Sequence, residues 1–235
     1  MLWLVFKNSM NYLPDEVGQL FCLEGCPTST VPHGNGNVND TFLLSCEKGG
    51  VVTRYTVQRI NHEVFKNPEG LMENFERVTE HLGQKLSVEN SPRRSLRLVH
   101  SQDGKPFVRD SCGNYWRMME YIDGGESAEI PESPRQAYQA AKAFGEFQAQ
   151  LADLPGSPLI QTIPDFHNTR KRFDDFRRVV TEDPVGKTNE VRDLITFAIA
   201  RESLADAINE KRFPVRIVHN DTKLNNVLLD KKTGE

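Results

Sequence analysis

The sequence predicts an α+β protein with two lobes, an antiparallel sheet that includes one helix and then a helical lobe. Three observations support this prediction. Residues 41–122 contain four runs rich in β-branched and aromatic residues, one amphipathic helical pattern separates the second run from the third, and the patterns after Gly124 and Gly125 are helical. We therefore expect an amino-terminal lobe over residues 1–122, a carboxy-terminal lobe over residues 123–235 and a cleft where they meet.

Turn-forming residues separate the predicted strands. Gly49 and Gly50 follow the first run, and Asp103 with Gly104 follows the third. Because such turns reverse the chain between consecutive strands, we expect an antiparallel meander. The predicted strands cover residues 41–45, 51–60, 95–100 and 115–122.

One helix is predicted inside the sheet-forming half, over residues 68–82. Its apolar positions recur with the helical period, and Pro68 suits the first turn. In the second half, Ser133 followed by Pro134 is a typical helix start. The remaining helical patterns cover residues 168–180 and 188–208.

Composition and charge exclude several functional classes. The 235 residues include 29 Lys and Arg and 33 Asp and Glu, a net charge of −4, so neither nucleic acid nor a membrane is an expected partner. The apolar run over residues 2–6 is too short for a signal peptide or a membrane span. The four cysteines lack the spacing of a zinc site. We therefore expect a cytoplasmic protein with free thiols.

The strongest chemical signal is the pattern H-x-D-x-x-x-x-N near the end of the chain. It consists of His219, Asp221 and Asn226 and lies between apolar runs at residues 215–218 and 227–229, which we expect to be short strands. His219 is expected to brace the loop rather than to react. The alternative is that Asp221 and Asn226 are turn formers in a surface loop.

Phosphoryl transfer to a hydroxyl group needs the residue types of this pattern. Asp221 would accept or orient the hydroxyl proton, and Asn226 would hold Mg²⁺ on the nucleotide phosphates. Lys223 could neutralise the phosphate during transfer. The pattern therefore predicts a phosphotransferase with Asp221 and Lys223 as catalytic residues and Asn226 as the metal ligand.

The segment VHNDTKLNNVLLD resembles the catalytic loop of the protein-kinase-like superfamily, most of all its aminoglycoside-phosphotransferase branch. Within that branch, the segments GNGNVNDTF, YTVQRIN and FKNPEGLMENFERVTEHL resemble the N-acetylhexosamine 1-kinases. This resemblance implies a protein-kinase-like fold, ATP and Mg²⁺ as cofactors, and transfer of phosphate to the anomeric hydroxyl of free N-acetylglucosamine or N-acetylgalactosamine.

The resemblance also implies a set of nucleotide-binding residues. A glycine-rich stretch would let backbone N–H groups approach the phosphates, although such a stretch can also be a hairpin turn. Val57 would pack over adenine, and Arg59 would grip the α- and β-phosphates where protein kinases have lysine; a solvated strand arginine is the alternative. The glycine-rich stretch consists of Gly34, Asn35, Gly36, Asn37, Val38 and Asn39.

Further positions follow from the same resemblance. A glutamate of the helix over residues 68–82 would pair with Arg59. Helical periodicity places Glu76 at the border of the apolar face and Glu73 toward solvent, and the choice between them stays open. His167 would contact the substrate, with a structural histidine as the alternative. The end of the last strand would form a hinge that binds adenine through Glu120, Tyr121 and Ile122.

The chain ends in a polar turn directly after residues 227–229. A strand in that position is expected to have a returning partner. In the superfamily this partner leads to an aspartate that supplies a second Mg²⁺ contact. Because no such residue is present, the sequence resembles a kinase that is incomplete at its carboxy terminus, and we expect the 235-residue chain to be inactive or nearly so.

Two alternative functions stay open. The acceptor could be an aminoglycoside, choline or a similar amino alcohol instead of a sugar. The protein could also be a non-catalytic nucleotide-binding module of the pseudokinase type. If the protein is a kinase of a sugar or of another acceptor, the expected partners are ATP and that small molecule.

Overall fold

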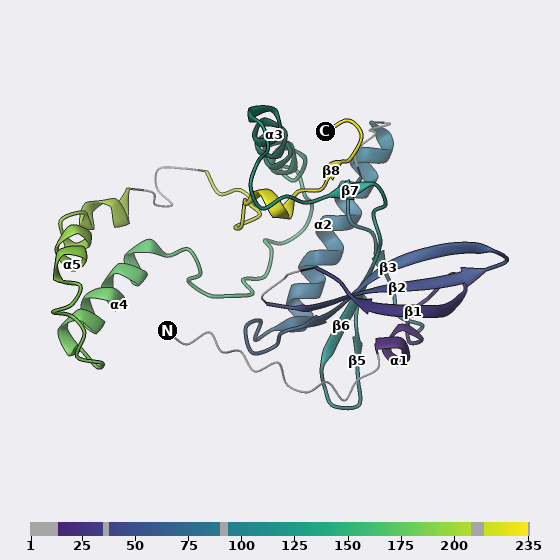
Figure 1. Ribbon diagram of the computed structural model, residues 1–235, viewed down its shortest axis with the longest axis horizontal. Helices are drawn as coiled ribbons and strands as arrows, with labels where there is room; N and C mark the ends of the chain where they lie inside the picture. The colour runs from purple at the N-terminus through teal and green to yellow at the C-terminus, as the bar shows by residue number, and fades with distance from the viewer. Residues whose placement is uncertain (1–13, 35–37, 90–93, 208–213, 235) are drawn as a thin grey trace. The chain divides into compact units, whose positions relative to one another are not determined.

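The computed structural model describes residues 14–34, 38–89, 94–207 and 214–234 (Figure 1). Its sheet is antiparallel, with neighbouring strands in the order β1-β2-β3-β6-β4 and with β5 paired to β6. This arrangement confirms the predicted mixed α+β class and the antiparallel sheet. The predicted meander is wrong in its strand order, because β6 lies between β3 and β4. The strands are β1 (Cys26–Pro32), β2 (Asp40–Lys48), β3 (Val51–Ile60), β4 (Leu98–Val99), β5 (Val108–Arg109) and β6 (Tyr115–Glu120).

Side chains alternate between the two faces of this sheet. Tyr55 and Val57 of β3 point to the same face as Leu44 and Phe42, which lie opposite them on β2. Helix α1 (Pro14–Gly18) packs on this face, which we call the core face. Its buried residues are Val17, Phe21, Phe42, Leu44, Cys46, Tyr55, Val57, Val99, Val108, Trp116 and Met118.

Helix α2 (Pro68–Val88) packs on the opposite face, which we call the helix face. It begins after Asn67, whose side chain accepts a hydrogen bond of 2.9 Å from the N–H of Gly70. Phe75 of α2 lies against the guanidinium of Arg117, a residue of β6 on the helix face. The predicted helix inside the sheet-forming half is therefore confirmed, and it continues beyond residue 82.

The second half of the chain is mainly helical, as predicted. Ser133 and Asn168 each cap a helix by accepting a hydrogen bond from a backbone N–H of the first turn. The predicted helix over residues 188–208 is divided into an α-helix and a 3₁₀ helix. None of the helices in the described ranges is long and apolar enough to cross a membrane. The elements are α3 (Pro134–Gln150), α4 (Thr169–Glu182), α5 (Arg192–Ile199) and the 3₁₀ helices η1 (Glu202–Asp206) and η2 (Leu224–Asn226).

The two short strands predicted around the catalytic motif differ in outcome. Residues 215–218 form a loop instead of a buried strand, and Val215 is 87% exposed. A strand needs a ladder partner, and this run has none in the described part of the chain. The second run contributes to β8 (Leu229–Asp230), which pairs antiparallel with β7 (Gly125–Glu126) directly after the predicted hinge.

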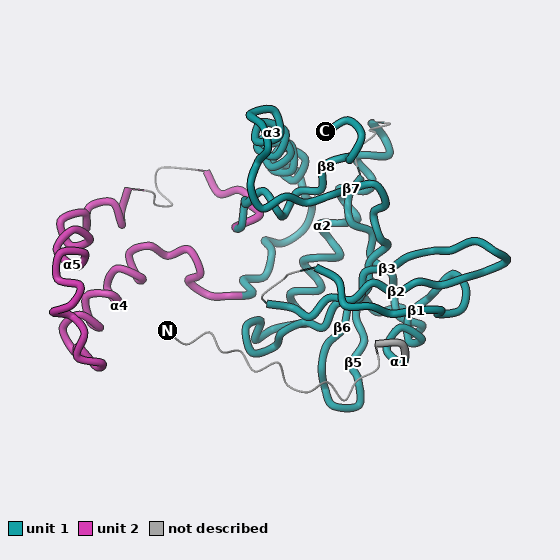
Figure 2. Tube along the Cα trace, in the orientation of Figure 1, with its two compact units in different colours: residues 1–162, 221–235 teal, residues 163–220 magenta. Residues whose placement is uncertain are grey.

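The chain divides into two compact units (Figure 2). Unit 1 comprises Met1–Thr162 and Asp221–Glu235, and unit 2 comprises Ile163–Asn220. Unit 1 therefore contains the sheet, α2, α3 and the loop with the predicted catalytic residues, while unit 2 contains α4, α5 and η1. The lobe boundary after residue 122 stays a prediction.

Candidate active site

Asp221 and Asn226 lie side by side in one loop. The side-chain amide of Asn226 donates hydrogen bonds to Oδ2 of Asp221 at 2.9 Å and to its backbone oxygen at 2.7 Å. The turn of η2 brings the two residues together, and Nζ of Lys223 lies 3.5 Å from the same Oδ2. All three side chains are exposed, so a ligand can reach them. A carboxylate and an amide oxygen are ligands that Mg²⁺ accepts in proteins, so the donor set fits this ion.

Two contacts tie this loop to the segment that follows the predicted hinge. The side-chain amide of Asn225 donates a hydrogen bond of 3.0 Å to Oε1 of Glu129. The backbone N–H of Lys231 donates to the carbonyl oxygen of Gly124 at 2.9 Å, next to the pairing of β7 with β8. The position of the catalytic loop is therefore set within unit 1.

His167 holds the backbone that leads into this loop. Its Nε2 lies 2.8 Å from the carbonyl oxygen of Asn220, a residue in the left-handed region with φ of 63°. Because a carbonyl oxygen only accepts hydrogen bonds, Nε2 carries the proton. The ring also packs edge-on against Phe166. The predicted contact of His167 with substrate stays a prediction, with Nδ1 as the ring atom left for it.

The glycine-rich stretch is described only in part. Gly34 has φ of 77°, where glycine is favoured, and a Cβ atom there would meet nothing within 4 Å. Val38 is exposed, and the side-chain oxygen of Asn39 accepts a hydrogen bond of 3.0 Å from the N–H of Asn61, which ties the start of β2 to the end of β3. The phosphate contacts of this stretch stay predictions. Three of its residues lie outside the described ranges, namely Asn35, Gly36 and Asn37.

Val57 and Arg59 of β3 lie on the core face. Val57 is completely buried there, and strand alternation puts Arg59 on the same side. Arg59 pairs with Asp40 of β2, its Nε donating to Oδ2 at 2.8 Å. The predicted ion pair between Arg59 and a glutamate of α2 is not formed, because α2 packs on the helix face. The nucleotide contacts of Val57 and Arg59 stay predictions.

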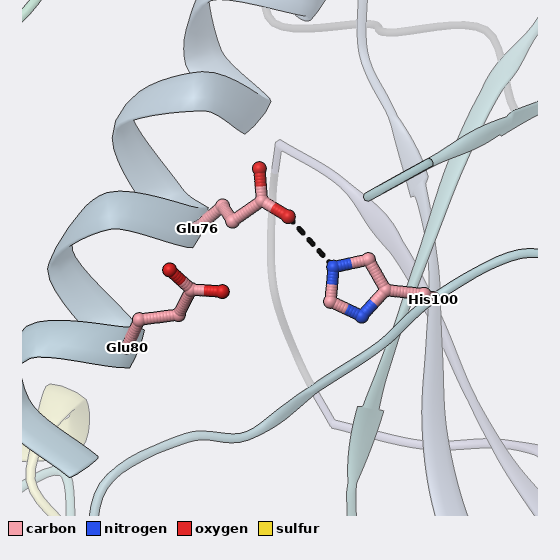
Figure 3. Close-up of side chains that lie close together, drawn as sticks. All are labelled: Glu76, Glu80 and His100. Carbon is pink, nitrogen blue, oxygen red and sulfur yellow. Dashed lines mark hydrogen bonds and ion pairs between the residues drawn. The ribbon is translucent and has the colours of Figure 1, made fainter. Parts of the chain in front are cut away.

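Glu76 of α2 pairs with a histidine instead. Its Oε1 lies 2.6 Å from Nε2 of His100, and the carboxylate of Glu80 lies on the next turn of the helix (Figure 3). Glu73, the other candidate, is exposed. The ligand atoms of Glu76, Glu80 and His100 lie within 4.8 Å of one another and could hold a metal ion. An imidazole nitrogen in the set suits zinc or another transition metal more than Mg²⁺.

The predicted hinge lies next to the glycine-rich stretch. The ring of Tyr121 contacts His33 edge-on, with ring centroids 5.6 Å apart, and the guanidinium of Arg54 lies 5.0 Å from the same ring. The backbone N–H groups of Glu120 and Tyr121 are bound by backbone carbonyls at 2.9 and 3.0 Å. Of the three predicted hinge residues, Ile122 therefore offers the amide for an adenine base. Adenine binding at the hinge stays a prediction.

No sequence pattern indicates Arg117, which the structure places on the helix face. Its Nε donates a hydrogen bond of 2.9 Å to Oε1 of Gln58, the residue opposite it on β3. Its guanidinium lies 4.5 Å from the ring centroid of Phe75. Its position beside Gln58 and Phe75 follows from the register of β3 with β6 and from the face of the sheet that α2 covers. Both are features of the three-dimensional structure.

Comparisons with known proteins find a matching family model and similar solved structures. A family model described as the phosphotransferase enzyme family, APH, matches residues 29–235. A crystal structure of a spectinomycin phosphotransferase, in complex with ADP and spectinomycin, is 12% identical with a TM-score of 0.53 over 89% of this chain and 62% of that chain. An aminoglycoside phosphotransferase from Alicyclobacillus acidocaldarius is 16% identical with a TM-score of 0.46 over 86% and 56% of the two chains.

The spectinomycin phosphotransferase shares the fold of this chain. Because the identity is low, the likeness concerns the fold alone. The chain spans about three fifths of the length of these solved proteins. The sequence resemblance to the aminoglycoside-phosphotransferase branch is confirmed at the level of the family.

Proposed function

The chain belongs to the phosphotransferase enzyme family, and on this basis we propose that the protein transfers phosphate from ATP to a hydroxyl group of a small molecule. The observation that carries the proposal is the pairing of Asp221 with Asn226 in one exposed loop. Asp221 accepts or orients the proton of the acceptor hydroxyl, and Lys223 neutralises charge on the transferred phosphate. Asn226 is the ligand for Mg²⁺, which supplies charge neutralisation on the phosphates when bound.

The acceptor in this proposal is the anomeric hydroxyl of free N-acetylglucosamine or N-acetylgalactosamine. Its support is the resemblance of three amino-terminal segments, at residues 34–42, 55–61 and 65–82, to the N-acetylhexosamine 1-kinases. The adjacent positions of Tyr121 and His33 support a nucleotide site between the hinge and the glycine-rich stretch. We place the reaction in the cytoplasm, consistent with the four free cysteines.

An acceptor screen tests the proposal. The full-length protein, expressed from the complete gene, is incubated with ATP and Mg²⁺ and with N-acetylglucosamine, N-acetylgalactosamine, glucose, choline or spectinomycin, and phosphorus NMR identifies the phosphorylated product. A signal of an anomeric sugar phosphate with either N-acetylhexosamine, lost in Asp221→Asn, is the expected result.

The other outcomes of the screen each exclude part of the proposal. Product from choline or spectinomycin alone would replace the sugar acceptor with an amino alcohol or aminoglycoside. Nucleotide binding without transfer to any acceptor would make the protein a non-catalytic nucleotide-binding module.

A further inference from the structure

Among the described residues, Arg117 on the helix face of the sheet is a cation without an acidic partner. Arg117 uses Nε to bind Gln58, and its guanidinium stacks on Phe75. Within the described ranges, no carboxylate pairs with this guanidinium. By contrast, Arg59 on the core face is neutralised by Asp40.

The surroundings of Arg117 favour binding of an anion. Burial lowers its pKa to about 10, which still leaves it charged at neutral pH. A desolvated charge without a counter-ion is costly, and an anion that binds beside it removes part of that cost. The side chain as a whole is partly buried, and among the described residues only its Nε is engaged in a hydrogen bond.

Arg117 lies on β6, the strand that leads into the predicted hinge. Arg117 lies three residues before Glu120 on the same strand, a separation of about 10 Å along an extended chain. Adenine at the hinge and phosphates at Arg117 would therefore lie along the same strand, β6. The guanidinium also faces α2, the element on which kinases carry the glutamate that pairs with their phosphate-binding lysine.

We propose that Arg117, held in orientation by Gln58, binds the α- and β-phosphates of the nucleotide from the helix face of the sheet. This inference rests on the proposed use of ATP. Strand β3 then supplies a neutral amide at the position opposite Arg117, and β6 supplies the charge that a strand lysine supplies in protein kinases. Guanidinium suits this task because it donates two parallel hydrogen bonds to a phosphate.

A comparison of ADP with adenosine tests the role of Arg117. Isothermal titration measures both affinities in the wild-type protein and in Arg117→Met, which keeps an apolar side chain on Phe75. We expect ADP affinity to fall about tenfold or more while adenosine affinity is unchanged, because only ADP carries phosphates. Arg109→Met is the matched control, since Arg109 also stacks on an aromatic ring, that of Tyr115 at 4.9 Å, on the same sheet.

Three results would overturn the inference. Equal losses for ADP and adenosine would show that Arg117 only supports the fold. Unchanged ADP affinity in Arg117→Met would exclude a phosphate contact. If the same titration shows that ADP affinity falls only in Arg59→Met, the phosphate contact belongs to Arg59. If Arg117→Met does not fold, Gln58→Leu provides the same test, with a smaller expected loss for ADP and none for adenosine.

Failure of the proposed function would look different. In that case the wild-type protein transfers no phosphate to any acceptor. Tighter binding of ADP than of adenosine, lost in Arg117→Met, would still support the phosphate contact. A wild-type protein that binds ADP no more tightly than adenosine would contradict both proposals.

Discussion

Oδ2 of Asp221 accepts a hydrogen bond from the side-chain amide of Asn226 at 2.9 Å, although five positions separate the two residues in the chain. Nζ of Lys223 lies 3.5 Å from the same oxygen. One carboxylate oxygen thus has two donors close to it, and Oδ1 is the oxygen left for an acceptor hydroxyl. The amide nitrogen of Asn226 is engaged, which leaves its side-chain oxygen for a cation.

Replacement of Asp221 tests this division of roles. We expect Asp221→Asn to lower kcat about 10²- to 10⁴-fold, because an amide cannot take the hydroxyl proton. The affinity for ADP should change little, since the residues proposed to bind adenine and the phosphates are untouched. Steady-state kinetics and isothermal titration measure the two quantities on the same preparations.

Asp193→Asn is the control for this experiment, because Asp193 is an exposed aspartate in the first turn of α5, in the other unit. It should leave kcat unchanged. An unchanged kcat in Asp221→Asn would remove Asp221 from the chemistry.

Replacement of Asn226 should change how strongly the reaction depends on Mg²⁺. We expect Asn226→Ala to raise the Mg²⁺ concentration needed for half-maximal rate, because one oxygen ligand is lost. Asn226→Asp keeps an oxygen at this position and should restore much of the Mg²⁺ response. A Mg²⁺ titration of the initial rate checks both variants. The same Mg²⁺ requirement in wild type and Asn226→Ala would contradict the assignment of Asn226 as a ligand.

The sequence predicted correctly those strands and helices whose bounds depend on residues close together in the chain. Strand β3 covers residues 51–60 as predicted, because the paired glycines before it and its β-branched residues act over a few positions. Helix α2 begins at Pro68 as predicted, because proline suits the first turn and Asn67 caps it. The predicted proximity of Asp221 and Asn226 is confirmed, because both residues belong to one short loop. Their catalytic role stays a prediction.

Contacts between distant segments could not be predicted in this way. Glu76 meets His100 because of which face of the sheet α2 covers. Arg59 meets Asp40 because the register of β2 with β3 places them opposite each other. Helical periodicity showed that Glu76 borders the buried side, but it does not identify a partner 24 residues away. The role we infer for Arg117 depends in the same way on strand register.

Asp110 should make stability depend on pH. Burial of its carboxyl opposes ionisation, but the indole N–H of Trp116 and the side chain and backbone of Asn114 donate hydrogen bonds to it, and together with the N–H of Cys112 they lower its pKa. A lowered pKa in the folded state contributes stability above the unfolded value, near 3.9, and this contribution is lost as pH falls through the folded pKa.

The variant Asp110→Asn isolates that contribution. We expect it to lower the free energy of unfolding by about 1–2 kcal/mol at pH 7, since hydrogen bonds to a charged acceptor are lost. At a pH below the folded pKa of Asp110, the difference from wild type should shrink, because both side chains are neutral there. Urea denaturation at the two pH values measures the effect. A difference of the same size at both pH values would show that shape, and not charge, is what Asp110 contributes.

Gly25, just before β1, lies close to the backbone of β2. It has φ of 100°, and a Cβ atom there would lie 2.6 Å from the backbone oxygen of Glu47. Gly49, in the turn between β2 and β3, has φ of 60°, but a Cβ atom there would meet nothing within 4 Å. Both positions impose the left-handed cost on alanine, about 1–2 kcal/mol, and only Gly25 adds a backbone clash.

We therefore expect Gly25→Ala to lower the free energy of unfolding by at least about 1 kcal/mol more than Gly49→Ala does, because β2 or the segment before β1 must shift to relieve the clash. Urea denaturation monitored by tryptophan fluorescence compares the two variants, since Trp116 of β6 is buried on the core face of this sheet. Because both glycines have a positive φ, comparing the two variants removes the conformational cost that the two alanines share. Equal destabilisation by the two variants would mean that the approach of Gly25 to Glu47 is looser in solution than 2.6 Å implies.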